Sequence, residues 1–302
     1  MNIWTGLQTP SILSDPTHLP LPHTLLTRFM STLLTTSELI KKYGLDAKKS
    51  LGQNFILDKN FTDKIARAAG DLSEFEVLEI GPGPGSLTRS ILDAGVKKLV
   101  AIEKDQRCLE ALGELKNFYG KRLEINEGDA LEIDETKFFN SARKFKIIAN
   151  LPYNIGTVLL FKWLKIAPQI SSMHLMLQKE VVDRIVAKPN TNHYGRLAVM
   201  VNFLCETKMV FKVSPSVFTP PPKVTSAIVE ITPRQKPLAD VDFDKLGKVV
   251  SAAFNQRRKM IKSGLKGIFE NPEEILKEVG IKSDLRPENL TIEDFCKLAA
   301  RL

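Results

Sequence analysis

Residues 77–103 read VLEIGPGPGSLTRSILDAGVKKLVAIE, and this stretch decides the fold of the chain. An apolar run leads into three glycines at alternate positions, a helical pattern follows, and a second apolar run ends at Glu103. A strand, a glycine turn, a helix and a second strand in this order are typical of a parallel βαβ unit. Glycine is needed where the backbone bends tightly or approaches a ligand, so the turn at Gly81 and Gly83 predicts a ligand site.

The alternation of short apolar runs with amphipathic segments continues to about Pro233. The sequence predicts strands at Val77–Ile80, Leu99–Glu103, Leu123–Asn126, Phe145–Asn150 and His174–Gln178. It predicts helices between them at Phe61–Ala69, Ser86–Ala94, Gln106–Leu115 and Val158–Ala167. This pattern favours an α/β fold in which a Rossmann-like parallel sheet carries helices on both faces. Two later runs, Lys208–Val213 and Val224–Ile231, are expected to form an antiparallel pair.

The two ends of the chain differ in composition from its middle. Residues 1–36 carry four prolines and only two charged side chains, Asp15 and Arg28, which predicts an extension that is disordered or loosely attached. Residues 37–236 are expected to form the ligand-binding domain. From Pro237 onward the pattern is helical, over Phe243–Val279 and Thr291–Leu302, which predicts a small all-α domain over residues 237–302.

The composition narrows the classes of partner. A chain of 302 residues with 43% hydrophobic residues can bury a large core, and its net charge of +8 favours an anionic partner such as nucleic acid. The three cysteines, Cys108, Cys205 and Cys296, are far apart and form neither a disulfide framework nor a metal-ligand pattern. No apolar run is long enough to cross a membrane. We therefore expect a monomeric cytoplasmic protein with no bound metal.

Two carboxylates stand at the ends of the predicted strands that follow the glycine turn. Glu103 ends the second strand, where a carboxylate can accept hydrogen bonds from both hydroxyls of a ribose. Asp129 follows the third strand and can accept from the amino group of an adenine. The glycines are spaced Gly-x-Gly-x-Gly rather than Gly-x-Gly-x-x-Gly, which favours S-adenosylmethionine over a dinucleotide. A nicotinamide cofactor and solvated acids at strand ends are the alternatives.

A second candidate site follows the strand Phe145–Asn150 and reads Asn150-Leu151-Pro152-Tyr153. The exocyclic amine of adenine is a poor nucleophile because its lone pair is delocalised into the ring. The Asn150 side-chain oxygen and the Leu151 carbonyl could accept from its two hydrogens, while Pro152 stiffens the turn that aims them. Tyr153 could stack on the base. Short motifs of this kind also occur as ordinary turns.

Phe218 is a candidate second ring on the opposite face of the base. It precedes the run Pro220-Pro221-Pro222, and such a run makes a loop rigid enough to position an aromatic side chain. A phenylalanine that is simply buried under the sheet edge fits the sequence equally well.

A basic segment in the helical tail is the candidate RNA-binding surface. Residues 255–268 contain no acid, and as one continuous helix they would place three cations four residues apart on one face. A stripe of one sign is an electrostatic footprint for phosphates. The cations of this segment are Arg257, Arg258, Lys259, Lys262 and Lys266.

Taken together, several motifs resemble those of one family, the bacterial ribosomal RNA small-subunit adenine N6-dimethyltransferases. The motifs are the runs at residues 52–56, 79–85, 150–155, 194–197, 218–224 and 254–259. The resemblance implies a class I methyltransferase sheet and dimethylation at N6 of two adjacent adenosines near the 3′ end of 16S rRNA, on an assembling small (30S) subunit. It also implies that S-adenosylmethionine contacts fall on Asn54, Ile56, Gly81, Glu103, Asp129 and Asn150.

Other functions remain open at this point. The 23S rRNA adenine methyltransferases share the cofactor and target motifs, although the run from Phe218 to Lys223 and the tail at Arg257, Arg258 and Lys259 argue against that class. A ribosome-assembly factor whose catalysis is secondary is a second alternative. An N6-adenine DNA methyltransferase is a third, although it would need a larger target-recognition domain than the segment after Pro237.

Overall fold

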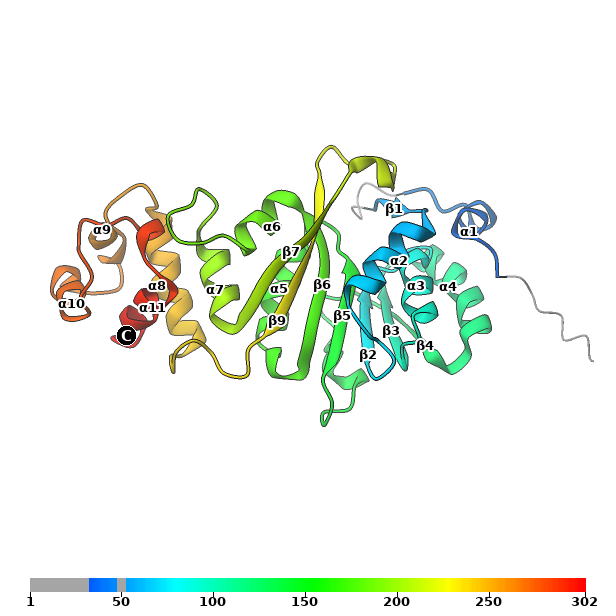
Figure 1. Ribbon diagram of the computed structural model, residues 1–302, viewed down its shortest axis with the longest axis horizontal. Helices are drawn as coiled ribbons and strands as arrows, with labels where there is room; N and C mark the ends of the chain where they lie inside the picture. The colour runs from blue at the N-terminus through cyan, green and yellow to red at the C-terminus, as the bar shows by residue number, and fades with distance from the viewer. Residues whose placement is uncertain (1–32, 48–52) are drawn as a thin grey trace, which may run out of the picture. The chain divides into compact units, whose positions relative to one another are not determined.

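A seven-stranded sheet forms the centre of the fold in a computed structural model that describes residues 33–47 and 53–302 (Figure 1). The strand order is β4-β3-β2-β5-β6-β9-β7, and all pairings from β4 to β6 are parallel. The strands are β2 (Glu76–Ile80), β3 (Lys98–Glu103), β4 (Leu123–Glu127), β5 (Phe145–Asn150), β6 (Ile170–Gln178), β7 (Cys205–Val213) and β9 (Ser226–Pro233).

All five predicted parallel strands are confirmed, and β6 begins earlier than expected, at Ile170. The expected antiparallel pair is confirmed as β7 and β9, and β9 in turn pairs antiparallel with β6. The parallel strands are near-continuous apolar runs because both faces of the sheet are covered. Their carboxyl ends therefore meet along one edge, where a doubly wound sheet binds its ligands.

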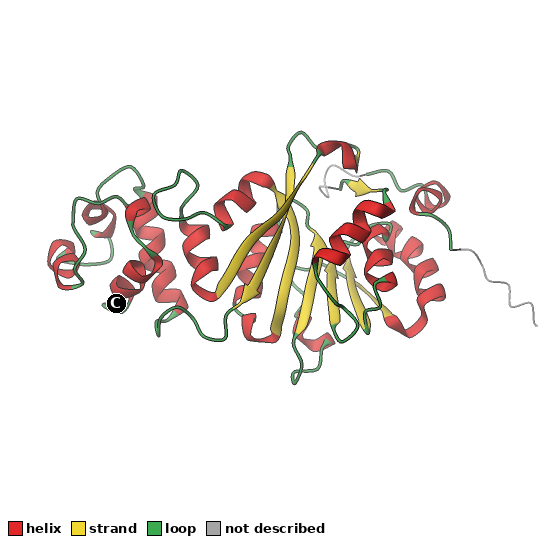
Figure 2. Ribbon diagram, in the orientation of Figure 1, coloured by secondary structure: helices red, strands yellow, loops and turns green. Residues whose placement is uncertain are grey.

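Helices cover both faces of the sheet, as predicted (Figure 2). Alternate residues of one strand enter different cores: Val77 packs into the first cluster, whereas Leu78 and Ile80 pack into the second. The first cluster includes α1 (Thr36–Tyr43), α2 (Lys59–Ala68), α3 (Ser86–Asp93) and α4 (Gln106–Tyr119). The second includes α5 (Gly156–Leu164), α6 (Lys179–Ile185) and part of α7 (Arg196–Leu204).

Several elements were not expected from the sequence. Helix α7 is buried on several sides, so its residues show no amphipathic period; Val201 packs against the sheet while Phe203 packs into a third cluster. Strands β1 (Phe55–Ile56) and β8 (Phe218–Thr219) have two residues each and, within the described part of the chain, pair only with one another. Such short strands carry no periodic signal.

The chain after β9 is helical, as predicted, and packs on α7 in the third cluster. Its helices are α8 (Phe243–Asn255), α9 (Ile261–Leu265), α10 (Pro272–Glu278) and α11 (Ile292–Ala299). The predicted boundary at residues 236–237 falls in the connection between β9 and α8, and a separate C-terminal domain stays a prediction. Most of the predicted N-terminal extension, residues 1–32, lies outside the described residues.

The predicted continuous basic helix over residues 255–268 is wrong. Helix α8 ends at Asn255, and α9 begins only at Ile261, where the Ile261 backbone N–H donates to the Leu285 carbonyl at 2.6 Å. The chain turns between the two helices because Ile261 and Leu265 are buried against α8, which an unbroken helix could not achieve. Arg258 therefore lies in the turn and does not share a helix face with Lys262 and Lys266.

Close packing of α9 on α8 depends on Gly264. A Cβ at this position would lie 3.1 Å from the Ala252 carbonyl oxygen and 3.1 Å from Ala253 Cα, and both are backbone atoms that cannot move alone. Gly264→Ala is therefore expected to lower the free energy of unfolding by about 1–3 kcal/mol, as overpacking does. Gly267→Ala is the matched control, because nothing lies within 4 Å of its Cβ position.

The two variants are compared by urea denaturation. The control is expected to stay within about 0.5 kcal/mol of the parent chain. Equal stability of the two variants would contradict the tight crossing of α8 and α9.

Candidate functional site

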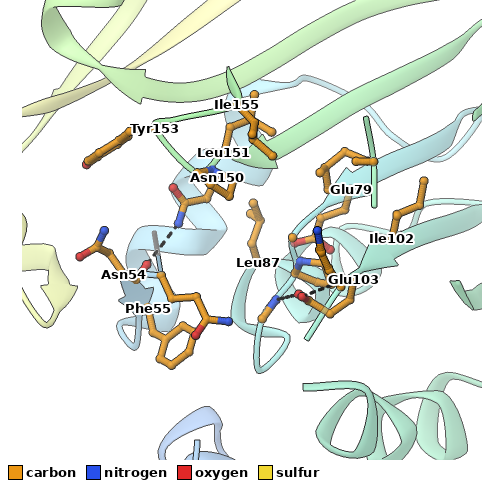
Figure 3. Close-up of a pocket in the computed structure, with 18 of the residues that line it drawn as sticks. Asn54, Phe55, Glu79, Leu87, Ile102, Glu103, Asn150, Leu151, Tyr153 and Ile155 are labelled. Carbon is orange, nitrogen blue, oxygen red and sulfur yellow. Dashed lines mark hydrogen bonds between the residues drawn. The ribbon is translucent and has the colours of Figure 1, made fainter. Parts of the chain in front are cut away.

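A pocket of about 380 Å³ lies beyond the carboxyl ends of the central parallel strands (Figure 3). From β2 the chain winds outward to β3 and β4, then returns to place β5 on the other side of β2. The pocket thus opens at the point where the strand order reverses, the usual ligand position in such a sheet. It brings together all the predicted cofactor and target residues: Asn54, Ile56, Gly81, Gly83, Glu103, Asp129, Asn150, Leu151, Pro152, Tyr153 and Phe218.

The glycine turn after β2 is held against the end of β3. Gly83 has φ +56°, and a Cβ there would lie 3.2 Å from the ring of Phe55. The Gly83 N–H donates to Glu103 Oε2 at 2.9 Å. Two constraints therefore favour glycine at this position, the left-handed backbone and the close approach of Phe55.

Glu103 is a buried carboxylate that accepts three backbone hydrogen bonds. Besides Gly83, the N–H groups of Lys104 and Asp105 both donate to Oε1 at 2.8 Å. Burial raises the pKa of Glu103, and the three N–H donors oppose that shift. A carboxylate offers about four acceptor directions. Among the described residues, one acceptor direction of Glu103, on Oε2, is therefore left for a ligand.

Asp129 is the more open of the two predicted acceptors. Its Oδ2 accepts from Lys104 Nζ at 2.7 Å, and its Oδ1 accepts from the Leu131 N–H at 2.9 Å. The Lys104 ammonium holds the pKa of Asp129 below its usual range. Asp129 is therefore an ionised acceptor at the pocket wall, suited to an N–H donor of a ligand.

Glu79, in the wall between these groups, was given no role by the sequence analysis. It is 1% exposed, and its Oε2 has no hydrogen-bond partner among the described residues. Burial raises the pKa of Glu79 to about 8, and the negative charge of Glu103 adds to the shift. The only signal in the sequence was an acid between apolar residues, one position before the end of the strand.

The target end of the pocket is built on the turn after β5. Asn150 Nδ2 donates to the Asn54 carbonyl at 3.4 Å, which leaves the side-chain oxygen as the group that a substrate can use (Figure 3). The Leu151 N–H donates to the Met176 carbonyl of β6 at 3.3 Å. The Asn150 side chain and the backbone that leads into Leu151 are thus both held by bonds to neighbouring segments.

The two candidate rings are fixed in different ways. The Tyr153 hydroxyl lies 2.7 Å from the hydroxyl of Ser226, and its ring is half-buried. Phe218 is 3% exposed and pairs with Ile56 through β8 and β1. The sequence left open whether Phe218 is a pocket ring or a buried core residue. In the structure it is both buried and part of the pocket wall.

The basic residues of the tail lie outside this pocket and differ in their surroundings. Arg257 pairs with Glu288 at 3.0 Å and donates to the Asn192 carbonyl at 2.6 Å, while Lys262 pairs with Glu273 at 2.7 Å. Within the part of the chain that the structure describes, Arg258, Lys259 and Lys266 make no ion pair. Of the five cations of the segment, these three therefore carry a charge that no described acid pairs with.

Residues 33–47 and 53–302 contain neither a membrane-spanning helix nor a metal cluster. No helix there is long and apolar enough to cross a membrane. No cluster of three or more His, Cys, Asp or Glu side chains there could hold a metal ion.

Comparison with known proteins identifies the family. Residues 44–302 match the family described as "Ribosomal RNA adenine dimethylase". The chain belongs to this family. A relative from Ruegeria pomeroyi, named "Ribosomal RNA small subunit methyltransferase A", is 50% identical over 276 residues, which cover 90% of this chain and 98% of the relative.

Two solved structures extend the comparison to the fold. A dimethyladenosine transferase from Plasmodium falciparum aligns with a TM-score of 0.70 and 30% identity, over 81% of this chain and 95% of that one. The 23S rRNA methyltransferase ErmE aligns with a TM-score of 0.63 and 27% identity, over 82% of this chain and 99% of that one. The class I methyltransferase fold expected from the sequence is thereby confirmed.

The raised pKa of Glu79 predicts a pH-dependent stability. Between about 4.5, its ordinary pKa, and about 8, the folded chain keeps a proton that the unfolded chain has released, so stability falls as pH rises. Glu79→Gln removes this titration at nearly constant shape. The advantage of the variant in free energy of unfolding should grow by up to about 1.4 kcal/mol per pH unit in this window and level off above it.

Urea denaturation of ligand-free protein at a series of pH values measures this difference. Glu110→Gln, at an exposed position on α4, is the control and should show no such trend. An advantage of Glu79→Gln that is constant across the series would show that Glu79 is ionised in the folded chain throughout.

Proposed function

We propose that this protein transfers methyl groups from S-adenosylmethionine to N6 of two adjacent adenosines near the 3′ end of 16S rRNA, during assembly of the small ribosomal subunit. One observation carries the proposal. A single pocket joins the glycine turn after β2, which is bonded to Glu103, to the turn Asn150–Tyr153 after the neighbouring strand β5. Family membership and the names of the relatives support the same reaction.

The residues of the pocket fit S-adenosylmethionine. The free acceptor direction of Glu103 suits one ribose hydroxyl, and the ionised Asp129 suits the adenine amino group. The volume of about 380 Å³ is within the usual range for a small-molecule site. When bound, the cofactor supplies a methyl group on a sulfonium, an electrophile that the target amine can attack directly.

The chain's own residues act on the target amine. The Asn150 side-chain oxygen and the Leu151 carbonyl accept from the two N6 hydrogens, which favours a pyramidal nitrogen with its lone pair directed at the methyl donor. The Tyr153 ring stacks on the base, and the proton that N6 loses passes to solvent. The enzyme's contribution is therefore mainly positioning: the bond to Asn54 fixes the Asn150 amide in advance, and the bond to Met176 holds the turn at Leu151.

The substrate reaches the pocket as an unpaired or flipped adenosine, because N6 is not accessible inside a duplex. Arg258, Lys259 and Lys266 would contact phosphates nearby, whereas Arg257 and Lys262 are already engaged with acids. We propose that the enzyme acts as a cytoplasmic monomer. A 23S rRNA target would fit the same pocket, but identity is 27% to ErmE against 50% to the small-subunit relative.

The direct test incubates undermethylated 30S particles with the protein and labelled S-adenosylmethionine, followed by mass spectrometry of the 16S rRNA. Two adjacent dimethyladenosines are the expected product. Glu103→Ala should reduce methylation at least about 100-fold through loss of cofactor binding, while binding to 30S particles persists. Undiminished methylation by Glu103→Ala would show that the cofactor assignment is wrong.

Asn150 is expected to matter more for the first transfer than for the second. An unmethylated amine offers hydrogens to both acceptors, whereas a monomethylated amine has one hydrogen and leaves one acceptor unused. Asn150→Ala should therefore slow transfer to an unmethylated substrate roughly tenfold more than transfer to a monomethylated one, the loss of about one hydrogen bond. Single-turnover rates on the two RNAs give the comparison, and equal slowing of both steps would refute the assigned role of Asn150.

A further inference from the structure

The Tyr153 hydroxyl bonds to a residue on β9, a strand that does not line the pocket. Tyr153 comes from the turn after β5, whereas its hydroxyl partner, Ser226, is the first residue of β9. Ser226 is completely buried, and among the described residues its hydroxyl bonds only to that of Tyr153. It is absent from the pocket wall, so any effect it has on a ligand must pass through Tyr153.

The position of Ser226 is set by the sheet rather than by the pocket. It pairs with Gln178 of β6 on one side and with Val213 of β7 on the other. The backbone is fixed further where the Lys179 N–H donates to the Thr225 carbonyl at 2.9 Å. A hydroxyl on this rigid strand end is a fixed point against which the far end of the Tyr153 ring is held.

The tyrosine is therefore tethered at both ends. Its Cα is held in the turn, and in Figure 3 the hydroxyl end of the ring points away from Asn150. A phenyl ring held only at Cα can swing about its first side-chain bond, whereas one also bonded through its hydroxyl has its far end fixed in place. The same chain segment that ends at Ser226 begins at Phe218, so one loop connects the anchor of the first ring to the second.

We propose that Ser226 is a positioning residue that holds the far end of the Tyr153 ring in place and thereby sustains the second methyl transfer to each adenosine. This inference rests on the proposed function. In the first transfer two N6 hydrogens orient the amine between Asn150 and Leu151, but in the second only one remains. Stacking on Tyr153 does not depend on the number of hydrogens, so the second transfer relies more heavily on the fixed ring.

Loss of Ser226 should therefore slow the second transfer more than the first, the reverse of the effect expected for Asn150. Ser226→Ala should lower the single-turnover rate on monomethylated RNA roughly 5- to 10-fold and the rate on unmethylated RNA by no more than about twofold, an effect of slight misplacement. Monomethyladenosine should accumulate in the product. Tyr153→Phe, which removes the other half of the same bond without touching the buried strand, should show the same ratio of effects.

A double-mutant cycle distinguishes an effect of the Tyr153–Ser226 bond from a general loss of stability. If the two hydroxyls act only on one another, Ser226→Ala in the Tyr153→Phe background should change neither rate further. Ser90→Ala is the matched control, because it removes a buried hydroxyl that lies 2.7 Å from Thr62 in the α2–α3 packing and does not line the pocket. It should alter stability without altering the ratio of the two rates.

The outcomes are distinct. Multiplying effects in the double variant, or equal slowing of both transfers, would overturn the role of Ser226. An impaired Tyr153→Phe beside an unaffected Ser226→Ala would also overturn it, because the tyrosine hydroxyl would then act on the RNA directly. If the unsubstituted protein transfers no methyl group to the RNA at all, the proposed function itself fails.

Discussion

The site depends on one hydrogen bond, from the Gly83 N–H to the carboxylate of Glu103. β2 and β3 pair in parallel with Ile80 opposite Ile102, and the Gly81 N–H donates to the Ile102 carbonyl at 2.9 Å. This register brings the glycine turn of one strand directly beside the final side chain of the next. A shift by one residue would turn Glu103 to the other face of the sheet and leave the turn without its acceptor.

The order of the strands places the target side of the pocket next to the cofactor side. β5 pairs with β2, with Ile147 opposite Leu78, so the turn at Asn150 opens beside the glycine turn. β6 and β9 then extend the sheet beyond β5, and the first residue of β9 reaches back to Tyr153. The topology thus provides rigid supports on both sides of a reaction whose catalysis is mostly a matter of alignment.

Much of this arrangement could be predicted from the sequence because the strands are buried on both faces and the ligand turn is short. The strand ends at Ile80, Glu103 and Asn150 followed from apolar runs alone, and Glu103 and Asp129 followed from their places after those runs. Asn54 and Ile56 were reached only through family resemblance, because β1 has two residues and no pattern of its own.

Features set by tertiary contacts could not be predicted. The break in the basic segment depends on Gly264 packing against the α8 backbone, which no helical period reveals. The raised pKa of Glu79 depends on burial from several elements at once. The bond from Tyr153 to Ser226 joins residues 73 positions apart, and its existence depends on the register of the antiparallel strands.

The central claim is that a methyl donor and an unpaired adenine meet between the tips of β2, β3 and β5. A crystal structure of the protein with S-adenosylhomocysteine and an adenosine-containing oligonucleotide tests it most directly. We expect the ribose of the cofactor product beside Glu103 and the purine of the target against the Tyr153 ring, with N6 facing Asn150. Density for either adenine outside this pocket, or a target base held with N6 turned away from Asn150, would contradict the account.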